Sequence, residues 1–306
     1  MSSVISSHSP DAVSQAVSVL NAGGLVGLPT ETVYGLAARA DLDNAVEHIF
    51  RAKGRPAGHP LILHISDSSE LNRYAANIPN SALQLAQHCW PGPLTLLLEK
   101  TNAVSHRVTG GRETVAIRIP ANLCARKIIE QCGNAVAAPS ANLFGHVSPT
   151  TAQHVLNDLG NSIDLIVDDG SCSIGVESTI VDFTTDQPQL LRPGGFPAED
   201  LESIIGQQIL MPSGESRASG MLASHYAPRC KVVVVETIAE AELACSEHAN
   251  ARILDHWDNA PLYAASLYTQ MRQADADGIA VIFAVLPNKS GLGMAIRDRL
   301  SKASFL

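Results

Sequence analysis

The feature that most limits the fold is the regular interleaving of short apolar runs with amphipathic helical segments. Apolar residues recur at helical spacing in residues 11–22 and 41–52. Short apolar runs at 25–29, 60–65 and 93–99 predict buried strands between and after these helices. Because helices and strands alternate throughout, the pattern predicts an α/β or α+β fold.

The middle of the chain continues the same alternation. The segment 114–119 (TVAIRI) has a period of two, which predicts a strand that faces a core on one side only. Runs at 135–139 and 178–183 predict further strands, and helices are expected near 122–132 and 150–159.

A break in this pattern divides the chain. Residues 211–228 are rich in Ser, Gly and Pro and show no periodicity, which is typical of a linker or a mobile loop. A second α/β pattern begins with the apolar run 231–236 (KVVVVE). The sequence therefore predicts a catalytic domain at 1–210, a linker or lid at 211–229, and a small C-terminal α/β domain at 230–306.

Composition narrows the class of ligand. The chain has 306 residues, of which 45 % are apolar, so it can bury a sizeable core. Its formal net charge of −9 argues against a nucleic-acid coat or an anionic membrane surface as partner. Basic residues nevertheless gather at Arg51, Lys53 and Arg55. An acidic chain with a local basic cluster suits a small anionic ligand better than a long polyanion.

The cysteines and the first residues indicate the compartment. Six cysteines are scattered without a C-x-x-C pair, a spacing that supports neither a zinc site nor a disulfide scaffold. The first residues lack a basic start followed by an apolar core, and no apolar run approaches the roughly 20 residues that span a bilayer. We therefore expect a cytoplasmic protein without membrane contact.

The common nucleotide-binding and hydrolase motifs are missing, so any ATP site must be of another kind. Residues 29–38 (PTETVYGLAA) follow a predicted strand, where open α/β folds bind ligands, although alone they are equally a polar turn. Lys53 and Arg55 stand in a Gly- and Pro-rich loop that predicts either a phosphate cradle or a solvated turn. His64, in an apolar strand, is either a buried core residue or a ligand.

Two later segments carry further polar groups. The strand at 135–139 runs into Pro-Ser-Ala-Asn at 139–142, whose hydroxyl and amide groups can bond a base, ribose or phosphate. The alternative is a capping loop before the next helix. Glu177-Ser178-Thr179 precedes one predicted strand, and Arg192 ends another directly before Pro-Gly-Gly. Arg192 could serve as an anion clamp or in a structural ion pair.

Together these segments resemble, in order and spacing, the YrdC-type threonylcarbamoyl-AMP synthases in their long form with a C-terminal domain. The resemblance rests on a set of motifs, namely PTETVYGL at 29–36, K-x-R-P at 53–56 followed by PLILHI, AIRIP at 116–120, PSAN at 139–142, ESTIVD at 177–182 and LRPG at 191–194. It continues through HYAP at 225–228 to GLGMAIRDRLSKAS at 291–304. His59 stands where the family commonly has Asn.

The resemblance implies a fold and a reaction. The fold would be a twisted mixed sheet with a concave cavity, similar to dihydroxybutanone-phosphate synthase, plus the small C-terminal α/β domain. The enzyme would be a nucleotidyltransferase that joins L-threonine, bicarbonate or CO2, and ATP into threonylcarbamoyl-AMP and pyrophosphate. Mg2+ would escort the triphosphate, without a metal site of the protein's own. A tRNA threonylcarbamoyl transferase would take over the product to modify the adenosine beside the anticodon.

The resemblance also assigns residues, motif by motif. Threonine would be bound by Thr32, His64, Arg118, Ala138 and Ser178. ATP would be bound by Arg55, His59, Thr114, Ser140, Asn142, Ser148, Arg192 and Tyr226. Lys53 and Arg55 would be the catalytic residues, because positioning and charge neutralisation dominate nucleotidyl transfer. Arg118 suits the threonine carboxylate, since its fork matches two oxygens.

Two other functions and one conformational question stay open at this stage. The concave domain could instead recognise structured RNA, at least by a weak contact, or the chain could perform another ATP-dependent carbamoyl transfer, as in hydrogenase maturation proteins. The segment 212–228 predicts a lid that brings Tyr226, and with it His225, to the nucleotide. The alternative is an exposed tether between domains.

Overall fold

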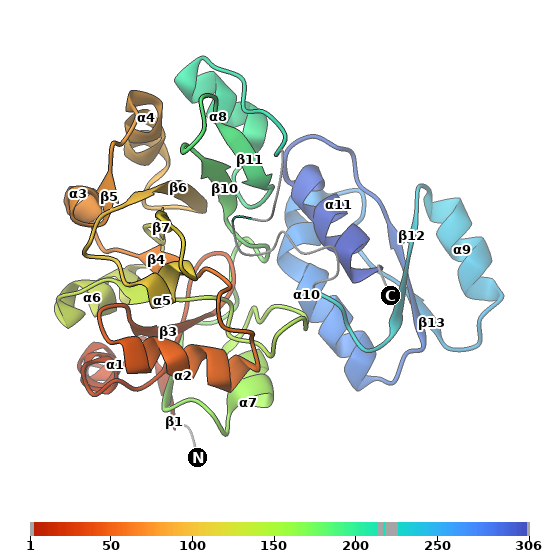
Figure 1. Cartoon of the computed structure of the whole chain (residues 1–306). Coiled ribbons are helices and arrows are strands. Elements are labelled where there is room, and N and C mark those ends of the chain that lie inside the picture. Colours follow the sequence, from red (N-terminus) through yellow and green to blue (C-terminus); the bar gives the residue numbers. More distant parts are fainter. Residues whose placement is uncertain (1–2, 213–216, 218–225, 305–306) are drawn as a thin grey trace.

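The computed structural model describes residues 3–212, 217 and 226–304, and it places two α/β units side by side (Figure 1). Among these residues, the larger unit is built on an 11-stranded mixed sheet in the order β1-β9-β2-β3-β8-β4-β7-β6-β10-β11, with β5 paired to β6. Its strands are β1 (Ser3–Ser6), β2 (Val26–Leu28), β3 (Gly35–Arg39), β4 (Ile62–His64), β5 (Ala75–Ala76), β6 (Leu94–Lys100), β7 (Thr114–Arg118), β8 (Val136–Ala137), β9 (Leu165–Asp168), β10 (Thr179–Asp182) and β11 (Gln189–Arg192).

Helices cover this sheet on both faces. They are α1 (Ala12–Asn21), α2 (Asp43–Lys53), η1 (Ser68–Glu70), α3 (Leu71–Tyr74), α4 (Asn80–Cys89), α5 (His106–Thr109), α6 (Leu123–Cys132), α7 (Ala152–Leu159) and α8 (Ala198–Ile205). On one face Leu20 of α1 and Ile128 of α6 share a buried cluster with strand residues. On the other, Ile49 of α2 and Leu85 of α4 belong to the largest cluster.

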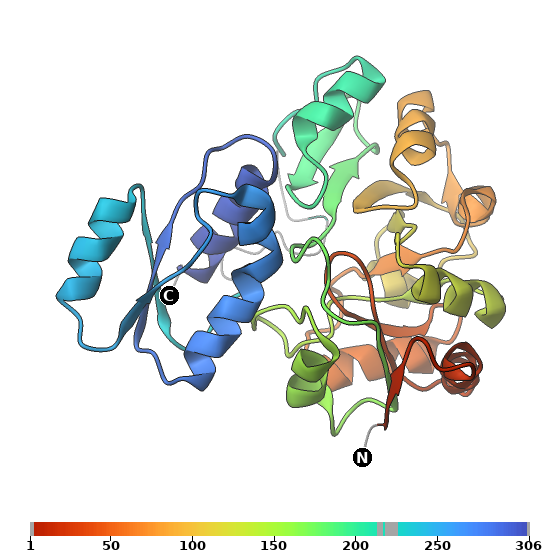
Figure 2. The same cartoon turned by 180° about the vertical axis from the view of Figure 1, so that it is seen from behind.

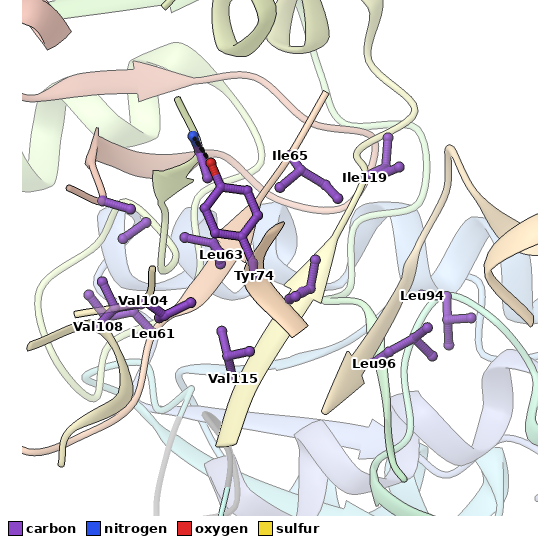
Figure 3. Close-up of a cluster of buried hydrophobic side chains, with 14 of the residues drawn as sticks. Leu61, Leu63, Ile65, Tyr74, Leu94, Leu96, Val104, Val108, Val115 and Ile119 are labelled. Atoms are coloured by element: carbon purple, nitrogen blue, oxygen red, sulfur yellow. Dashed lines mark hydrogen bonds between the residues drawn. The ribbon is translucent and has the colours of Figure 1, made fainter. Parts of the chain in front are cut away.

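Figure 3 shows part of that largest cluster, where side chains of neighbouring strands meet. Leu63, Val115 and Leu96 come from β4, β7 and β6, so the core is continuous across three adjacent strands. Tyr74 brings a hydroxyl into this apolar region. The hydroxyl accepts a hydrogen bond from the Ala135 amide at 3.2 Å, which satisfies both buried groups.

The smaller unit is a three-stranded parallel sheet with helices on both faces. Its elements are β12 (Lys231–Val235), α9 (Ile238–Ser246), β13 (Ala251–Ile253), α10 (Ala260–Ala276), β14 (Val281–Val285) and α11 (Leu292–Ala303), with strand order β12-β14-β13. Both views place α10 and α11 between the two sheets and α9 on the outer side (Figures 1 and 2). None of the helices in the described part of the chain is long and apolar enough to cross a membrane.

The two units share one buried apolar cluster. Val33, Val147 and Val176 of the larger unit pack with Leu267 of α10 and Ile296 of α11. The C-terminal unit is therefore docked on the larger one through a common core.

The alternation of helices and strands is confirmed, and one expectation about it is wrong. The strand β7 does not have one solvent face, because its residues from Val115 to Arg118 are all buried. Val115 and Ile117 face the largest core, whereas Ala116 joins a second small cluster that includes Ile180 of β10. Neighbouring strands on both sides and a covered second face turn a period-two pattern into a fully buried strand. Seven elements of the described part of the chain lacked a prediction, namely β1, β3, η1, α3, β5, α5 and α8.

Candidate active site

Strand register brings the polar residues of distant motifs to one place. β4 and β7 are parallel, and their register pairs His64 with Arg118 at the ends of both strands. β6 runs antiparallel to β7, so its Thr95 lies opposite Arg118. β10 is parallel to β6, which puts Ser178, just before β10, within 2.7 Å of the Thr95 hydroxyl. Because β11 is antiparallel to β10, Arg192 arrives beside Ser178.

These strand ends surround a cavity of about 50 Å³. Eight residues predicted from the sequence line it, namely Arg55, His64, Arg118, Ala138, Ser140, Ser178, Arg192 and Tyr226. A larger hollow of about 620 Å³ lies beside α2 and contains none of the predicted residues. We therefore take the smaller cavity, which collects the buried polar side chains, as the candidate site.

Arg118 is held by groups on three sides. Its side chain is buried, and it donates hydrogen bonds to the Gly92 carbonyl at 3.2 Å and the Thr32 hydroxyl at 2.8 Å. The same guanidinium forms an ion pair with Glu31 at 2.6 Å. The other oxygen of Glu31 accepts from the Ala121 amide at 3.0 Å. These contacts fix Arg118 in position, and Thr32 supports it from outside the cavity lining.

His64 is a neutral hydrogen-bonding group at the cavity wall. Its side chain is buried, and burial together with nearby Arg118 lowers its pKa from 6.5 to about 3. The Nδ1 atom lies 3.2 Å from the Ile62 carbonyl oxygen, which can only accept, so Nδ1 carries the hydrogen. The Nε2 atom is then an acceptor. The Ile62 carbonyl also accepts a hydrogen bond from the Ala138 amide at 3.0 Å.

Two arginines form the other end of the cavity. Arg192 is buried and donates from Nε and Nη2 to the Ser178 carbonyl at 3.0 and 2.9 Å, and from Nη2 to the Ser178 hydroxyl at 3.0 Å. Arg55 donates from Nη2 to the Pro60 carbonyl at 3.1 Å. Burial lowers the pKa of Arg55 to about 10, and nearby Arg192 acts in the same direction. Two buried guanidiniums at one end of the cavity are groups of the kind that bind anionic oxygens.

Lys53 has a different environment from the expected one. It is the last residue of α2, which ends at Gly54 in the left-handed region, and its ammonium donates to the carbonyls of Ser140 and Asn142 at 2.6 and 2.5 Å. It does not line the cavity, and burial lowers its pKa well below the usual value. In this structure Lys53 therefore holds the loop that carries Ser140.

Asn142 and Ser148 also bind within the protein, outside the cavity lining. Asn142 donates to the carbonyls of Leu143 and His146, both at 2.8 Å. Its Oδ1 atom is buried without a hydrogen-bond partner among the described residues. The Ser148 hydroxyl donates to the Glu177 carboxylate at 2.6 Å.

Two further predicted ATP residues are not brought to the cavity. Thr114 begins β7, at the opposite end of that strand from Arg118. His59 is half-buried in the loop before β4, with its ring 5.6 Å from that of Phe144. Neither residue lines the cavity in this structure, so the direct contact with ATP predicted for each is not seen.

Tyr226 joins the cavity to the C-terminal unit. It is 1 % exposed, has a φ of +64° and lines the cavity, and its ring stacks on Tyr268 of α10 at 5.9 Å. The guanidinium of Arg299, on α11, lies 4.9 Å from the ring centre of Tyr226. His225 and the rest of the predicted lid lie outside the described residues, apart from residues 212, 217 and 226–228.

Sequence reasoning missed several residues of this site. Glu31 and Thr95 support Arg118 and Ser178, and Glu177 lines the cavity while it pairs with Arg299 at 2.6 Å. The signal for Glu31 and Glu177 was present, since each stands inside a matched motif. Arg299 also stands inside a matched segment, 291–304, but its partner Glu177 is 122 positions away, so nothing local indicated that the two meet.

The residues present do not form a metal site of their own. Among the described residues, no group of three His, Cys, Asp or Glu side chains is close enough to hold an ion. The two acidic side chains of the site, Glu31 and Glu177, are engaged by arginines.

The fold and the cavity define an α/β protein with a deeply buried, cationic ligand site at its strand ends. Comparison with known proteins is consistent with this class. The family model described as "Telomere recombination", which covers the Sua5, YciO and YrdC proteins, matches residues 18–194. A second, described as "Threonylcarbamoyl-AMP synthase, C-terminal domain", matches residues 196–304.

Individual relatives agree over nearly the whole chain. The threonylcarbamoyl-AMP synthase of Pyrococcus abyssi is 42 % identical, over 94 % of this chain and 93 % of that protein. The Bacillus subtilis enzyme of the same name is 39 % identical, over 98 % and 94 %. The crystal structure of P. abyssi Sua5 in complex with L-threonine matches with a TM-score of 0.94 and 39 % identity, over 99 % and 97 % of the two chains. The chain belongs to the threonylcarbamoyl-AMP synthase family of enzymes.

Proposed function

We propose that this chain makes threonylcarbamoyl-AMP and pyrophosphate from L-threonine, bicarbonate or CO2, and ATP. The observation that carries the proposal is that one cavity is lined by Arg118 and His64 and also by two further buried arginines. Arg118 and His64 would form one end, with Thr32 behind Arg118, and Arg55 and Arg192 would form the other. Groups suited to a carboxylate and to a polyphosphate therefore line one cavity, which has to widen beyond its about 50 Å³ to admit both ligands with their reacting groups facing each other.

The threonine end would be built around Arg118. Its fork would take the amino-acid carboxylate, in a position fixed by Glu31 and Thr32. The neutral His64 would accept a hydrogen bond from the threonine ammonium or hydroxyl. The Ser178 hydroxyl could donate to the carbamate or accept from the threonine hydroxyl. The backbone at Ala138 would form the floor.

The ATP end would neutralise the phosphates. Arg55 and Arg192 would contact the polyphosphate, with Ser140 and Tyr226 beside them. ATP would arrive as its Mg2+ complex, since the described residues do not form a metal site. We assign Lys53, Asn142 and Ser148 to holding this end in shape, because their contacts are with protein groups.

The reaction balances without further reagents. Threonine and bicarbonate give N-carboxy-threonine and water. A carbamate oxygen then attacks the α-phosphorus of ATP, an O–P bond forms, the bond to the leaving pyrophosphate breaks, and threonylcarbamoyl-AMP remains. Positioning and charge neutralisation are the main contributions that such a transfer requires from the protein.

We further propose a cytoplasmic enzyme with a catalytic domain at 1–210, a linker at 211–229 and a C-terminal domain at 230–306. Its product would pass to a tRNA threonylcarbamoyl transferase. The C-terminal family match favours this function over the carbamoyl transfer of hydrogenase maturation proteins.

The test is the substrate dependence of pyrophosphate release. Release should need threonine and bicarbonate together, and threonylcarbamoyl-AMP should be detectable by mass spectrometry. The proposal would be wrong if pyrophosphate were released at the full rate from ATP and threonine in bicarbonate-free buffer. Arg192→Ala should raise the KM for ATP more than it weakens threonine binding, since Arg192 also holds Ser178.

A further inference from the structure

A buried carboxylate at the cavity wall is shared between the two α/β units. Glu177 is 6 % exposed, and the larger unit contributes the Ser148 hydroxyl at 2.6 Å. The C-terminal unit contributes the Tyr268 hydroxyl at 2.9 and 3.1 Å and the Arg299 guanidinium at 2.6 Å. Glu177 is therefore neutralised by a cation that belongs to the other unit.

Arg299 is built into this position. Its side chain is fully buried, with 0 % exposure, although it stands on α11 of the C-terminal unit. Besides Glu177, it donates from Nη2 to the Pro193 carbonyl at 3.1 Å, next to Arg192, and from Nη1 to Asp298 at 2.5 Å. Its guanidinium also lies 4.9 Å from the centre of the Tyr226 ring.

Charge near the ATP end of the cavity depends on this arginine. Glu177 is close enough to Arg192 for the two charges to influence each other. Burial raises the pKa of the Glu177 carboxyl, but Arg299, Arg192 and the hydrogen bond from Ser148 outweigh burial and bring the pKa to about 2. The carboxylate is thus charged at neutral pH. Without Arg299 it would repel a polyphosphate and compete with it for Arg192.

We propose that Arg299 is a positioning residue for ATP: from the C-terminal domain it neutralises Glu177, so that Arg192 keeps its place on Ser178 and the cavity stays cationic. The proposal rests on the proposed function, in which Arg192 contacts the phosphates. It gives the C-terminal domain an electrostatic role in the catalytic cavity.

The first experiment compares Arg299→Met with Arg297→Met by calorimetric titration of the full chain with ATP and with adenosine. Arg297 is a matched control, because it stands on the same helix and pairs with Glu236 inside the C-terminal unit at 3.0 Å. Arg299→Met should lower the affinity for ATP by at least about tenfold and the affinity for adenosine by less than about twofold, because the variant loses a positive charge. Arg297→Met should bind both ligands as the unmodified protein does.

The second experiment tests the carboxylate itself. Glu177→Gln introduced into Arg299→Met removes the uncompensated charge and should restore most of the ATP affinity. In Arg299→Met alone, burial would raise the Glu177 pKa, so its affinity should approach that of the double variant as pH falls from about 8 to about 5. Within the described part of the chain, the other groups that act on Glu177 are Ser148, Arg192, Tyr226 and Tyr268. Burial raises the pKa of Tyr226 to about 12 and that of Tyr268 well above its usual value, so neither tyrosine titrates in this window.

If the methionine variant does not fold, Arg299→Lys takes its place, because it keeps the positive charge. It should retain ATP affinity within about threefold of the unmodified protein. The inference is overturned if folded Arg299→Met binds ATP normally, or if it loses ATP and adenosine equally with no recovery on adding Glu177→Gln. It is also overturned if Arg299→Lys folds but loses ATP by more than about tenfold. If the unmodified protein binds no ATP, the proposed function fails instead.

Discussion

Replacing Arg118 with alanine should remove threonine recognition and leave ATP recognition in place. The guanidinium is 4 % exposed and donates to the Gly92 carbonyl, Thr32 and Glu31 at 3.2, 2.8 and 2.6 Å, so it is held where a carboxylate would bind. Truncating one partner of a buried, hydrogen-bonded charge pair costs about 2–5 kcal/mol. That range corresponds to a threonine Kd raised from about thirtyfold to several thousandfold.

The same substitution also affects folding, and a second variant separates the two effects. Arg118→Ala leaves the Glu31 carboxylate buried without its ion pair, which should lower the free energy of unfolding by roughly 3–5 kcal/mol. Adding Glu31→Gln removes that charge while its amide oxygen can still accept from the Ala121 amide. The double variant should recover much of the melting temperature and still fail to bind threonine. Calorimetry showing threonine affinity within about twofold of the unmodified protein in either variant would refute this assignment of Arg118.

Three further substitutions test other parts of the site. Lys53→Met should weaken ATP and lower the free energy of unfolding by about 1–3 kcal/mol, measured by calorimetry and urea denaturation, because the Ser140 carbonyl loses its donor. His64→Gln should flatten the loss of stability between about pH 6.5 and pH 3, since the folded imidazole stays neutral there and the unfolded one takes up a proton. Gly175→Ala should lower both the melting temperature and ATP affinity far more than Gly170→Ala does, because only the first Cβ would meet α10.

Most elements of the fold were predictable because their signals are local. Helices α1, α2 and α6 show apolar residues at helical spacing, and β4, β6 and β10 are short apolar runs. The strand β3 was missed because its residues, Gly35–Arg39, follow directly on a polar motif that indicates a turn. The helix α8, at Ala198–Ile205, is short and follows Pro197, and its burial is limited to Leu201.

The site was predictable where matched motifs carry its polar residues, most of them at strand ends. His64, Arg118, Ser178 and Arg192 meet because strand register aligns those ends, and the motifs mark them in the sequence. The sequence could not show which polar residues face the cavity and which support it. Lys53 was expected at the phosphates, yet a buried ammonium between two carbonyls has the contacts of a structural group.

The C-terminal unit supports the cavity wall from behind, through contacts with Glu177 that are distant in the sequence and were therefore hard to foresee. A Cβ at Gly175 would lie 2.4 Å from the Ala264 carbonyl oxygen, so backbone just before the ESTIVD motif contacts α10 directly. The shared cluster with Val176 and the ion pair of Glu177 with Arg299 follow at the next two positions. Close backbone contact, apolar packing and charge pairing thus act at consecutive residues of one catalytic motif. A change in how the C-terminal unit docks must therefore reach Ser178 and the ATP end of the cavity through the backbone that joins them.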